Sequence, residues 1–511
     1  MSKTLFPLRA LIIMILAFAL WATAAPYPVH AATITVTTEV DEDGGGADCS
    51  LREAITAANS NAAYGGCAAG TAGLDTIAFS GVTGTINLGS ALPNLAESIQ
   101  INGPGAADLT IDGQTDSFDG FSIIIPAGGN LTAVTLSGLT LTNFRHALYG
   151  ASVGLEISLS DMSITSSGQG GGSVNNHGAI YVTSADLTLD RVTLSNNTGY
   201  RGGALSYQPT ANGHTLTITD STFTNNTANT GSGGAIFLYP TGGGTTSHTI
   251  TRSTLAGNTG ASAGAILVWV NGATSTINIS HTTFSGNSAT TGTGADAAYF
   301  TASTAAAIVG NSQANITYST FSGHNNDTNA STTGVLHVSR ADSSSSSLSV
   351  TRTLIANNPA SAGGAFRECT AGGGTTFGGS NNLTNDTFCA GRTAAPTNVN
   401  STLADNGGHT DTHALLAGSN AIDALVVSAT CVPGTTADQR TAARANGLNA
   451  GDSACDIGAY EYSSTLTVLA IALAQWGTAA TAATPLLWLG LALILLTLTL
   501  LATRLKWNRG S

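Results

Sequence analysis

The side chains that could carry out acid–base chemistry in this sequence are few and widely spaced. The best group is Asp190, Asp220 and His281, which a repeated strand pattern would bring to one face of the protein. A polysaccharide lyase needs a carboxylate cluster for calcium and a group that removes a proton, whereas a glycoside hydrolase needs paired carboxyl groups. The acidic residues between 187 and 355 do not recur at equal offsets in neighbouring repeats. We therefore expect no catalytic residues, and a lyase or hydrolase acting on extracellular glycans is the alternative.

Two short motifs have the residue types of a metal site but not its spacing. His409 and His413 are four residues apart, yet they follow two glycines, show no helical pattern and have no third ligand nearby. Asp41, Glu42 and Asp43 lack the spacing of an EF-hand loop. We expect no metal site and no cofactor, although calcium stays an open alternative for so acidic a chain.

The six cysteines fall as three local pairs, and the sequence has no Cys-x-x-Cys spacing. An even number of cysteines in an exported chain predicts disulfides. Pairing between neighbours would close loops of roughly 20 residues, each worth about 3 kcal/mol, but the connectivity cannot be deduced from sequence. The candidates are Cys49, Cys67, Cys369, Cys389, Cys431 and Cys455.

A repeated unit organises the middle of the chain. The segments 187–197, 216–226 and 277–287 share one pattern of alternating apolar and polar residues rich in Thr, Val and Ile. Alternation at period two and a variable loop between copies predict the coils of a parallel β-helix over 76–400. The apolar anchors of the copies are Leu136, Leu159, Leu189, Ile218, Ile250, Ile279, Ile316 and Val350, with a second apolar position five residues after each.

Two polar ladders follow from this alignment. Eight residues after the anchors lie Asn197, Asn226, Asn258, Asn287 and Asn358, with His324 in one copy. Stacked inward asparagines hydrogen-bond from coil to coil, so we interpret them as structural. Two residues after the anchors lie Asp161, Arg191, Asp220, Arg252, His281, Tyr318 and Arg352. The first four alternate in sign, as stacked neighbours should.

Both ends of the β-helix have sequences that suit a cap. Ser50 and Glu53 form a capping box that starts a short helix with one apolar face, within an N-terminal cap at 32–75. Such a helix would cover the open first coil. Residues 401–462 are predicted as the C-terminal cap.

The termini predict export and anchoring. Lys3 and Arg9 precede a short apolar run, so residues 1–31 have the pattern of a signal peptide. A linker at 463–485 leads to the uncharged stretch 486–503, which is long enough to span a bilayer as a helix. The basic tail at 504–511 places the C-terminus in the cytoplasm and the N-terminus outside.

Charge excludes one class of partner. Residues 32–484 hold all 29 acidic residues and 11 arginines but no lysine, which gives this region a net charge of −18. Nucleic-acid binding needs a basic surface, so we expect no nucleic-acid partner.

Several motifs resemble known families. Cys49–Ile55 resembles the CSLREA domain, which is found near the start of many exported bacterial β-helix proteins. Phe223-x-x-Asn226 followed by Gly233-Gly-Ala-Ile236 is similar to the repeat of chlamydial polymorphic outer-membrane proteins. The latter resemblance implies an all-β, right-handed parallel β-helix. The series 406–416, 418–423, 438–440 and 455–461 resembles the choice-of-anchor Q domain, which terminates such β-helices before varied anchors.

Together these features predict a single-pass protein of the cell surface. Its expected role is non-enzymatic: adhesion, an envelope component or passive display, with the membrane as partner through the C-terminal helix. An extracellular glycan or the surface of a host or neighbouring cell is the expected ligand class. A calcium- or glycan-binding module is a further alternative.

Overall fold

The computed structural model describes most of the chain between its two termini. It covers residues 31–462 apart from 126–130, 152–153, 169–176, 211, 230–232, 292–293, 306–307, 325–333, 359–366, 427–430, 432–436, 443 and 445–453. The predicted signal peptide, except for its last residue, and the predicted linker, membrane span and tail lie outside these residues. Within the described part of the chain, no helix is both long and apolar enough to cross a bilayer.

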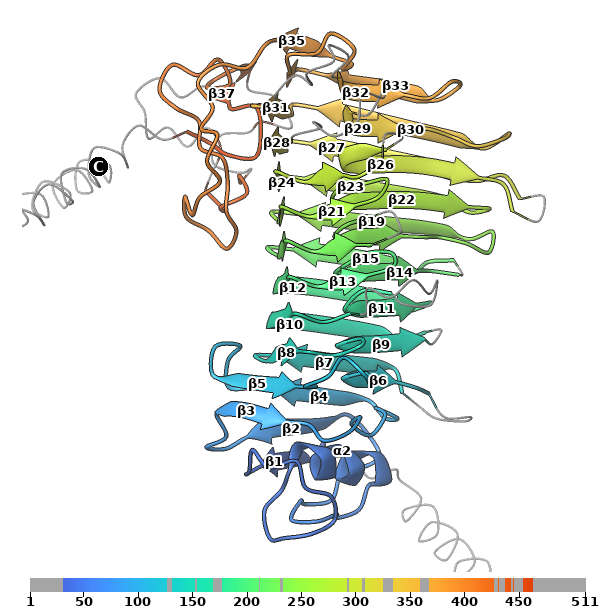
Figure 1. Cartoon of the computed structure of the whole chain (residues 1–511), viewed down its shortest axis with the longest axis vertical. Coiled ribbons are helices and arrows are strands. Elements are labelled where there is room, and N and C mark those ends of the chain that lie inside the picture. The colour runs from blue at the N-terminus through green and yellow to red at the C-terminus, as the bar shows by residue number, and fades with distance from the viewer. Residues whose placement is uncertain are drawn as a thin grey trace, which may run out of the picture.

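The described chain is an all-β solenoid of stacked parallel strands (Figure 1). Its largest sheet has 22 strands in two series, which β10 and β12 join because they run through both. The first series is β1 (Thr33–Val36), β2 (Asp75–Phe79), β4 (Ile99–Asn102), β7 (Ala133–Ser137), β10 (Glu156–Thr165), β12 (Asp186–Ser195), β15 (Thr215–Thr219), β19 (Thr245–Thr251), β23 (Thr274–Ser280), β27 (Asn311–Thr317), β30 (Ser345–Thr351) and β33 (Thr376–Ser380). The second series adds β3 (Gly84–Asn87), β5 (Leu109–Asp112), β8 (Thr140–Thr142), β16 (Thr222–Thr224), β20 (Thr254–Ala256), β24 (Thr283–Ser285), β28 (Thr320–Ser322), β31 (Leu354–Ala356), β34 (Asn382–Leu383) and β35 (Arg392–Ala394).

Three smaller sheets complete the described fold. A nine-stranded parallel sheet forms another face of the solenoid, and a four-stranded sheet of two-residue strands forms a corner. The nine strands are β6 (Phe121–Ile123), β9 (Leu148–Ala151), β11 (Ile180–Thr183), β14 (Leu205–Gln208), β18 (Ile236–Leu238), β22 (Ile266–Asn271), β26 (Ala295–Ser303), β29 (Gly334–Val338) and β32 (Arg367–Ala371). The corner strands are β13 (Thr198–Gly199), β17 (Thr227–Ala228), β21 (Thr259–Gly260) and β25 (Ser288–Ala289). Near the C-terminal end, β36 (Leu425–Val426) and β37 (Ala454–Cys455) form an antiparallel pair.

The predicted register of the repeats is confirmed. Every anchor from Leu136 to Val350 pairs with the anchor of the next coil, and so do the apolar residues five positions later. These side chains are buried and fill the interior. Because each strand alternates between inside and outside, a slip of one residue would expose the whole apolar set.

The asparagine ladder runs inside one corner. The side-chain amide of Asn197 donates to Asn226 Oδ1 at 3.0 Å, Asn226 donates to Asn258 at 2.9 Å, and Asn258 donates to Asn287 at 2.9 Å. Each of these amides also donates to a backbone carbonyl of the preceding coil. His324 interrupts the series, and its backbone N–H donates to Asn358 Oδ1 at 2.9 Å. The ladder therefore satisfies buried polar groups that the turn would otherwise leave without partners.

The residues two positions after the anchors share one backbone conformation. From Asp161 to Arg352, all seven have φ between 47° and 55°, the left-handed region. This conformation turns the chain between the two strand series and points the side chains outward. Left-handed conformations normally favour Gly, Asn and Asp, so the stacking of these side chains must offset some strain.

Glycine is required at another corner. An added Cβ on Gly203 would lie 2.4 Å from the carbonyl oxygen of Gly234, and one on Gly234 would lie 2.0 Å from that of Gly264. Successive coils approach too closely there for any side chain. The Gly-Gly-Ala-Ile motif is thus explained by the close backbone approach at the corner that precedes the nine-stranded sheet.

Helix α2 (Leu51–Ser60) packs against the first coil, at the blue end of Figure 1. Ser50 and Glu53 form a complete capping box, with Ser50 Oγ accepting from the Glu53 N–H and Glu53 Oε2 accepting from the Ser50 N–H. Arg52 does not pair with Glu53: its guanidinium donates twice to Asp41, at 2.9 Å each. The apolar face of the helix joins the solenoid core, including Leu51 and Ile55.

All three predicted disulfides are present, and each joins sequence neighbours. The pairs are Cys49–Cys67, Cys369–Cys389 and Cys431–Cys455. The first fixes the N-terminal cap, and the third joins two parts of the C-terminal segment.

The flank segment, residues 401–462, lies along the side of the solenoid (Figure 1, orange and red). The sequence predicts this segment as the C-terminal cap. It docks beside β20, β24 and β28, where the hydroxyls of Thr254, Thr283 and Thr320 form hydrogen bonds with it. A second apolar cluster lies between the flank segment and the solenoid. Leu354 comes from the solenoid, and Leu415 and Ile457 come from the segment.

Candidate functional site

The predicted surface group of Asp190, Asp220 and His281 lies on one side of the solenoid but offers no free carboxylate. Asp190 pairs with Arg191, and Asp220 accepts two hydrogen bonds from Arg252, at 2.8 and 2.9 Å. The His281 ring stacks on Tyr318, with ring centroids 5.2 Å apart, and burial lowers the pKa of this histidine to about 3. The column is therefore an ionic and aromatic ladder, as its alternating charges indicate.

The two motifs with metal-ligand residue types are used for hydrogen bonds. Asp41 accepts from Arg52 and from the Gly89 N–H, and Asp43 accepts from a tyrosine hydroxyl. His413 contacts the Asn400 carbonyl through Nδ1 and Ser285 Oγ through Nε2. Among the described residues, no group of three His, Cys, Asp or Glu side chains could hold a metal ion.

The outer surface of the nine-stranded sheet carries a series of half-buried rings. Its strands alternate, so Ile236 and Leu238 enter the core while Phe237 and Tyr239 point away from it. The outward residues stack in register from coil to coil. The first outward column contains Ser122, Tyr149, Tyr181, Ser206, Phe237, Leu267, Tyr299, His337 and Thr370.

We call Phe237, Tyr239, Leu267, Trp269 and Tyr299 the aromatic strip. They form an apolar cluster separate from the solenoid core, with two buried side chains and three half-buried rings. The Phe237 and Tyr239 rings stack at 5.5 Å, and Tyr239 meets Trp269 edge-to-face at 5.5 Å. Such packing fixes ring positions and contributes about 0.5–1.5 kcal/mol per pair beyond area burial.

Hydrogen bonds between coils hold the polar edges of the strip. Trp269 Nε1 donates to Ser303 Oγ at 2.9 Å, and the Asn271 amide donates to the Tyr239 hydroxyl at 2.7 Å. The Tyr299 hydroxyl lies 2.7 Å from Ser339 Oγ. The strip is thus a preorganised surface, which lowers the entropy lost when a ligand binds.

Arg201 lies over the aromatic strip. Its guanidinium carbon is 5.4 Å from the centre of the Phe237 ring, 5.6 Å from that of Tyr200 and 6.0 Å from that of Trp269. These are cation–π distances. Arg201 lies four residues before the start of β14, and it forms a parallel β-bridge with His177 on the preceding coil.

A polar cluster adjoins the strip on the N-terminal side. Asp119 accepts two hydrogen bonds from Arg145, at 2.8 and 2.6 Å, and lies 2.8 Å from His146 Nδ1. These cationic and hydrogen-bonding partners lower the pKa of Asp119 to about 2, against the opposing effect of burial. Since the carboxylate can only accept, Nδ1 of His146 carries the proton. Its Nε2 is buried and has no hydrogen-bond partner among the described residues.

His177 joins this cluster to the strip. Its ring stacks on Tyr181, with centroids 3.8 Å apart, and its Nδ1 lies 3.0 Å from Ser206 Oγ. The pKa of His177 is lowered to about 4, first by burial and then by its electrostatic interactions with His146 and Arg201. The ring is therefore neutral at physiological pH.

The described side chains of this face do not have the arrangement of a glycosidase site. A glycosidase needs two carboxyl groups around one bond, and Asp119, the carboxylate that the cluster supplies, is held by Arg145 and His146. Rings, hydroxyls, imidazoles and a guanidinium are the groups that bind sugars by stacking and hydrogen bonding.

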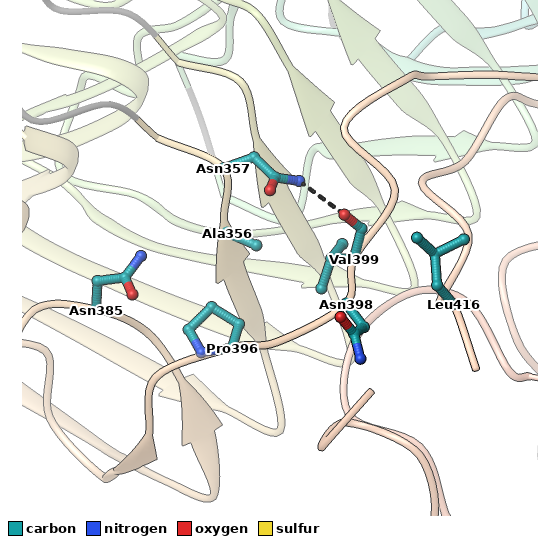
Figure 2. Close-up of a pocket in the computed structure, with 7 residues that line it drawn as sticks. All are labelled: Ala356, Asn357, Asn385, Pro396, Asn398, Val399 and Leu416. Atoms are coloured by element: carbon teal, nitrogen blue, oxygen red, sulfur yellow. Dashed lines mark hydrogen bonds between the residues drawn. The ribbon is translucent and has the colours of Figure 1, made fainter. Parts of the chain in front are cut away.

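A hollow of about 470 Å³ lies where the flank segment meets the last coils (Figure 2). In Figure 2 the Asn357 amide donates to the Val399 carbonyl at 3.5 Å. The lining is Ala356, Asn357, Asn385, Pro396, Asn398, Val399 and Leu416. None of these side chains titrates, so the hollow has no acid–base chemistry.

The aromatic strip did not emerge from the sequence alignment, which was built on the strands of the other sheet. An alignment on the Gly-Gly-Ala-Ile corner would have found it, because Phe237, Leu267 and Tyr299 each follow the inward residue of that corner strand. The loops between the large sheet and the Gly-Gly-Ala-Ile corner vary in length, so an alignment on the large sheet does not bring these residues into register.

No protein-family model matches the chain, and no curated protein matches it. The resemblances to the CSLREA domain, the choice-of-anchor Q domain and the polymorphic outer-membrane proteins therefore stay predictions.

Proposed function

We propose that this chain is a surface-anchored, right-handed parallel β-helix that binds extracellular polysaccharide along the nine-stranded sheet. The observation that carries the proposal is the aromatic strip: half-buried rings held at fixed positions on the outside of successive coils. Adhesion or display at the cell surface is the role that such binding would serve.

A linear polysaccharide is the ligand class that suits this surface best. Coils repeat at about 4.8 Å, so the strip presents rings along a straight line rather than around a compact pocket. The C–H faces of sugars stack on Tyr and Trp rings, and the hydroxyls at their edges meet serine and asparagine side chains such as Ser303 and Asn271. A rigid array favours binding of a repeating polymer through several weak contacts at once.

The anchoring part of the proposal rests on the sequence. The pattern of residues 1–31 supports export, and the uncharged stretch 486–503 with the basic tail 504–511 supports a single membrane span with the solenoid outside. Protease added to intact cells should digest the solenoid and leave the tail protected. Protection of the solenoid would contradict this orientation.

The binding proposal is tested with a polysaccharide array and the variant Trp269→Ala. The variant should bind the array ligands about tenfold more weakly, because loss of one stacked ring removes about 1.4 kcal/mol. The matched control is Gln313→Ala, an exposed outward residue on β27 of the other sheet. It should bind as the parent protein does. Circular dichroism should show that both variants keep the parent fold, although loss of the Trp269 contacts lowers the Tm of W269A. The proposal fails if the parent binds no polysaccharide, or if W269A binds as tightly as Q313A.

A further inference from the structure

We propose that Arg201 makes one point of the aromatic strip a subsite for a sugar that carries a carboxylate, that is, a uronic acid unit of the polymer. The inference rests on the proposed function and specifies its ligand. It depends on the position of the Arg201 guanidinium over the rings. It also depends on the absence, among the described residues, of an acceptor for the N–H groups of Arg201.

The guanidinium of Arg201 has no anionic partner. Among the described residues, none accepts a hydrogen bond from it or forms an ion pair with it, and its contacts are the three rings. Six of the eleven arginines of residues 32–484, among them Arg145 and Arg252, are held by carboxylates. Arg201 belongs with Arg352 and Arg367, whose guanidinium groups also lie over rings. Of these three, Arg201 contacts rings of the aromatic strip.

The position of the guanidinium favours a planar anion. A guanidinium whose described contacts are rings keeps its N–H groups for hydrogen bonds to a ligand. That edge matches the two oxygens of a carboxylate, which it can bind in a bidentate manner. Because the rings already fix the side chain, little rotamer entropy remains to be lost on binding.

The neighbours of Arg201 support an anion rather than a cation at this point. His177 lies beside it on the preceding coil, and Ser206 hydrogen-bonds to His177 at 3.0 Å. The nearest carboxylate of the cluster, Asp119, is already neutralised by Arg145.

The test compares acidic polymers with their neutral counterparts. The probes are polygalacturonate, alginate and hyaluronan, each next to its carboxyl-reduced form, with the full-length protein in detergent at 150 mM salt. The parent protein should bind at least one acidic polymer about tenfold more tightly than the reduced form of the same polymer. Arg201→Gln should remove this preference, so that the ratio of the affinities for the acidic and reduced forms falls to about one.

Two controls keep the outcomes separable. Arg392→Gln removes the same charge from an exposed site elsewhere and should keep the preference. Trp269→Ala should weaken binding of both forms, because stacking does not depend on the carboxylate.

The inference is overturned if the parent binds acidic and reduced forms equally, or if R201Q keeps the preference. It is also overturned if dextran sulfate binds with the same dependence on Arg201, since the site would then accept any oxyanion. Absence of binding to every polymer in either form would count against the proposed function itself.

Discussion

The hydroxyl of Thr283 donates a hydrogen bond to Gln439 Oε1 at 2.7 Å across 156 residues of sequence. The amide nitrogen of the same glutamine donates to Thr254 Oγ1 and to Thr410 Oγ1, at 2.9 Å each. Gln439 is almost fully buried, so one side chain joins two coils of the solenoid to two parts of the flank segment.

Replacing Gln439 with Ala should loosen the flank segment. The change leaves buried hydroxyls without partners and should make docking of the flank segment less favourable by about 2–4 kcal/mol. Hydrogen exchange of residues 401–462 should increase while exchange in β12 and β15 stays as in the parent. Equal exchange in the variant and the parent would show that the apolar cluster beneath the segment holds it without this residue.

Replacing Asn258 with Ala should destabilise the solenoid. The asparagine accepts from the backbone and side chain of Asn226 and donates to the Phe223 carbonyl and to Asn287. Its removal leaves several buried groups unsatisfied, and we expect a loss of about 3 kcal/mol in the free energy of unfolding. Urea unfolding measures it.

The matched control for the ladder is Asn315→Ala. Asn315 is exposed on β27, and its amide donates to Asn278 on the outer surface. Surface hydrogen bonds of this kind exchange readily with water, so its loss should change stability by less than about 0.5 kcal/mol. A similar effect of both variants would show that burial in the ladder adds nothing.

Asp296 should make the protein less stable as the pH rises. Its carboxyl is fully buried, Oδ2 has no hydrogen-bond partner within the described structure, and burial raises its pKa from 3.8 to about 6. The folded state therefore binds the proton more tightly than the unfolded state. The free energy of unfolding should fall between about pH 4 and pH 6 and stay lower above that range.

The variant Asp296→Asn removes this penalty. It should raise the free energy of unfolding at pH 7.5 by about 1–3 kcal/mol and change it little at pH 4, where the aspartate is protonated. An asparagine oxygen can still accept from the Ala289 N–H, as Oδ1 now does at 2.9 Å. Equal stabilisation at both pH values would argue that the carboxyl charge is not the cause.

The disulfide between Cys49 and Cys67 should stabilise the N-terminal cap. It closes a loop of 18 residues around α2, and such a loop contributes about 3 kcal/mol in the chain-entropy description. The double variant Cys49→Ala, Cys67→Ala should expose β1 and α2 to hydrogen exchange before the middle coils open. Uniform loss of protection along the whole solenoid would show that the cap has no separate stability.

The register of the solenoid could be predicted because it depends on the spacing of residues that are close in sequence. From Leu136 to Val350, each anchor and its partner five residues later lie inside one short strand pair, so loop length does not blur them. The capping box of Ser50 and Glu53 is local in the same sense. Neighbour pairing of the cysteines follows from the short loops that separate them.

The flank segment and the aromatic strip could not be predicted in the same way. Docking of Gln439 depends on outward threonines such as Thr283, which look like any other solvent-facing strand residue. The sequence predicts that Asp190, Asp220 and His281 share one face, but the bidentate contact of Arg252 with Asp220 is a matter of side-chain geometry. The spacing of the repeats predicts which residues stack on successive coils. Three-dimensional packing decides which of these side chains are free to contact a ligand.

The described chain ends at Tyr462 on the side of the solenoid, after Gly458 and Ala459 have bonded to the coils of Arg352 and Thr320. A mechanical pull transmitted through the chain beyond this point would reach several coils at once. It would load the flank contacts in shear, whereas tension on a terminal coil would peel the strands apart one by one. Under the proposed C-terminal anchoring, this lateral attachment would spread drag over several coils.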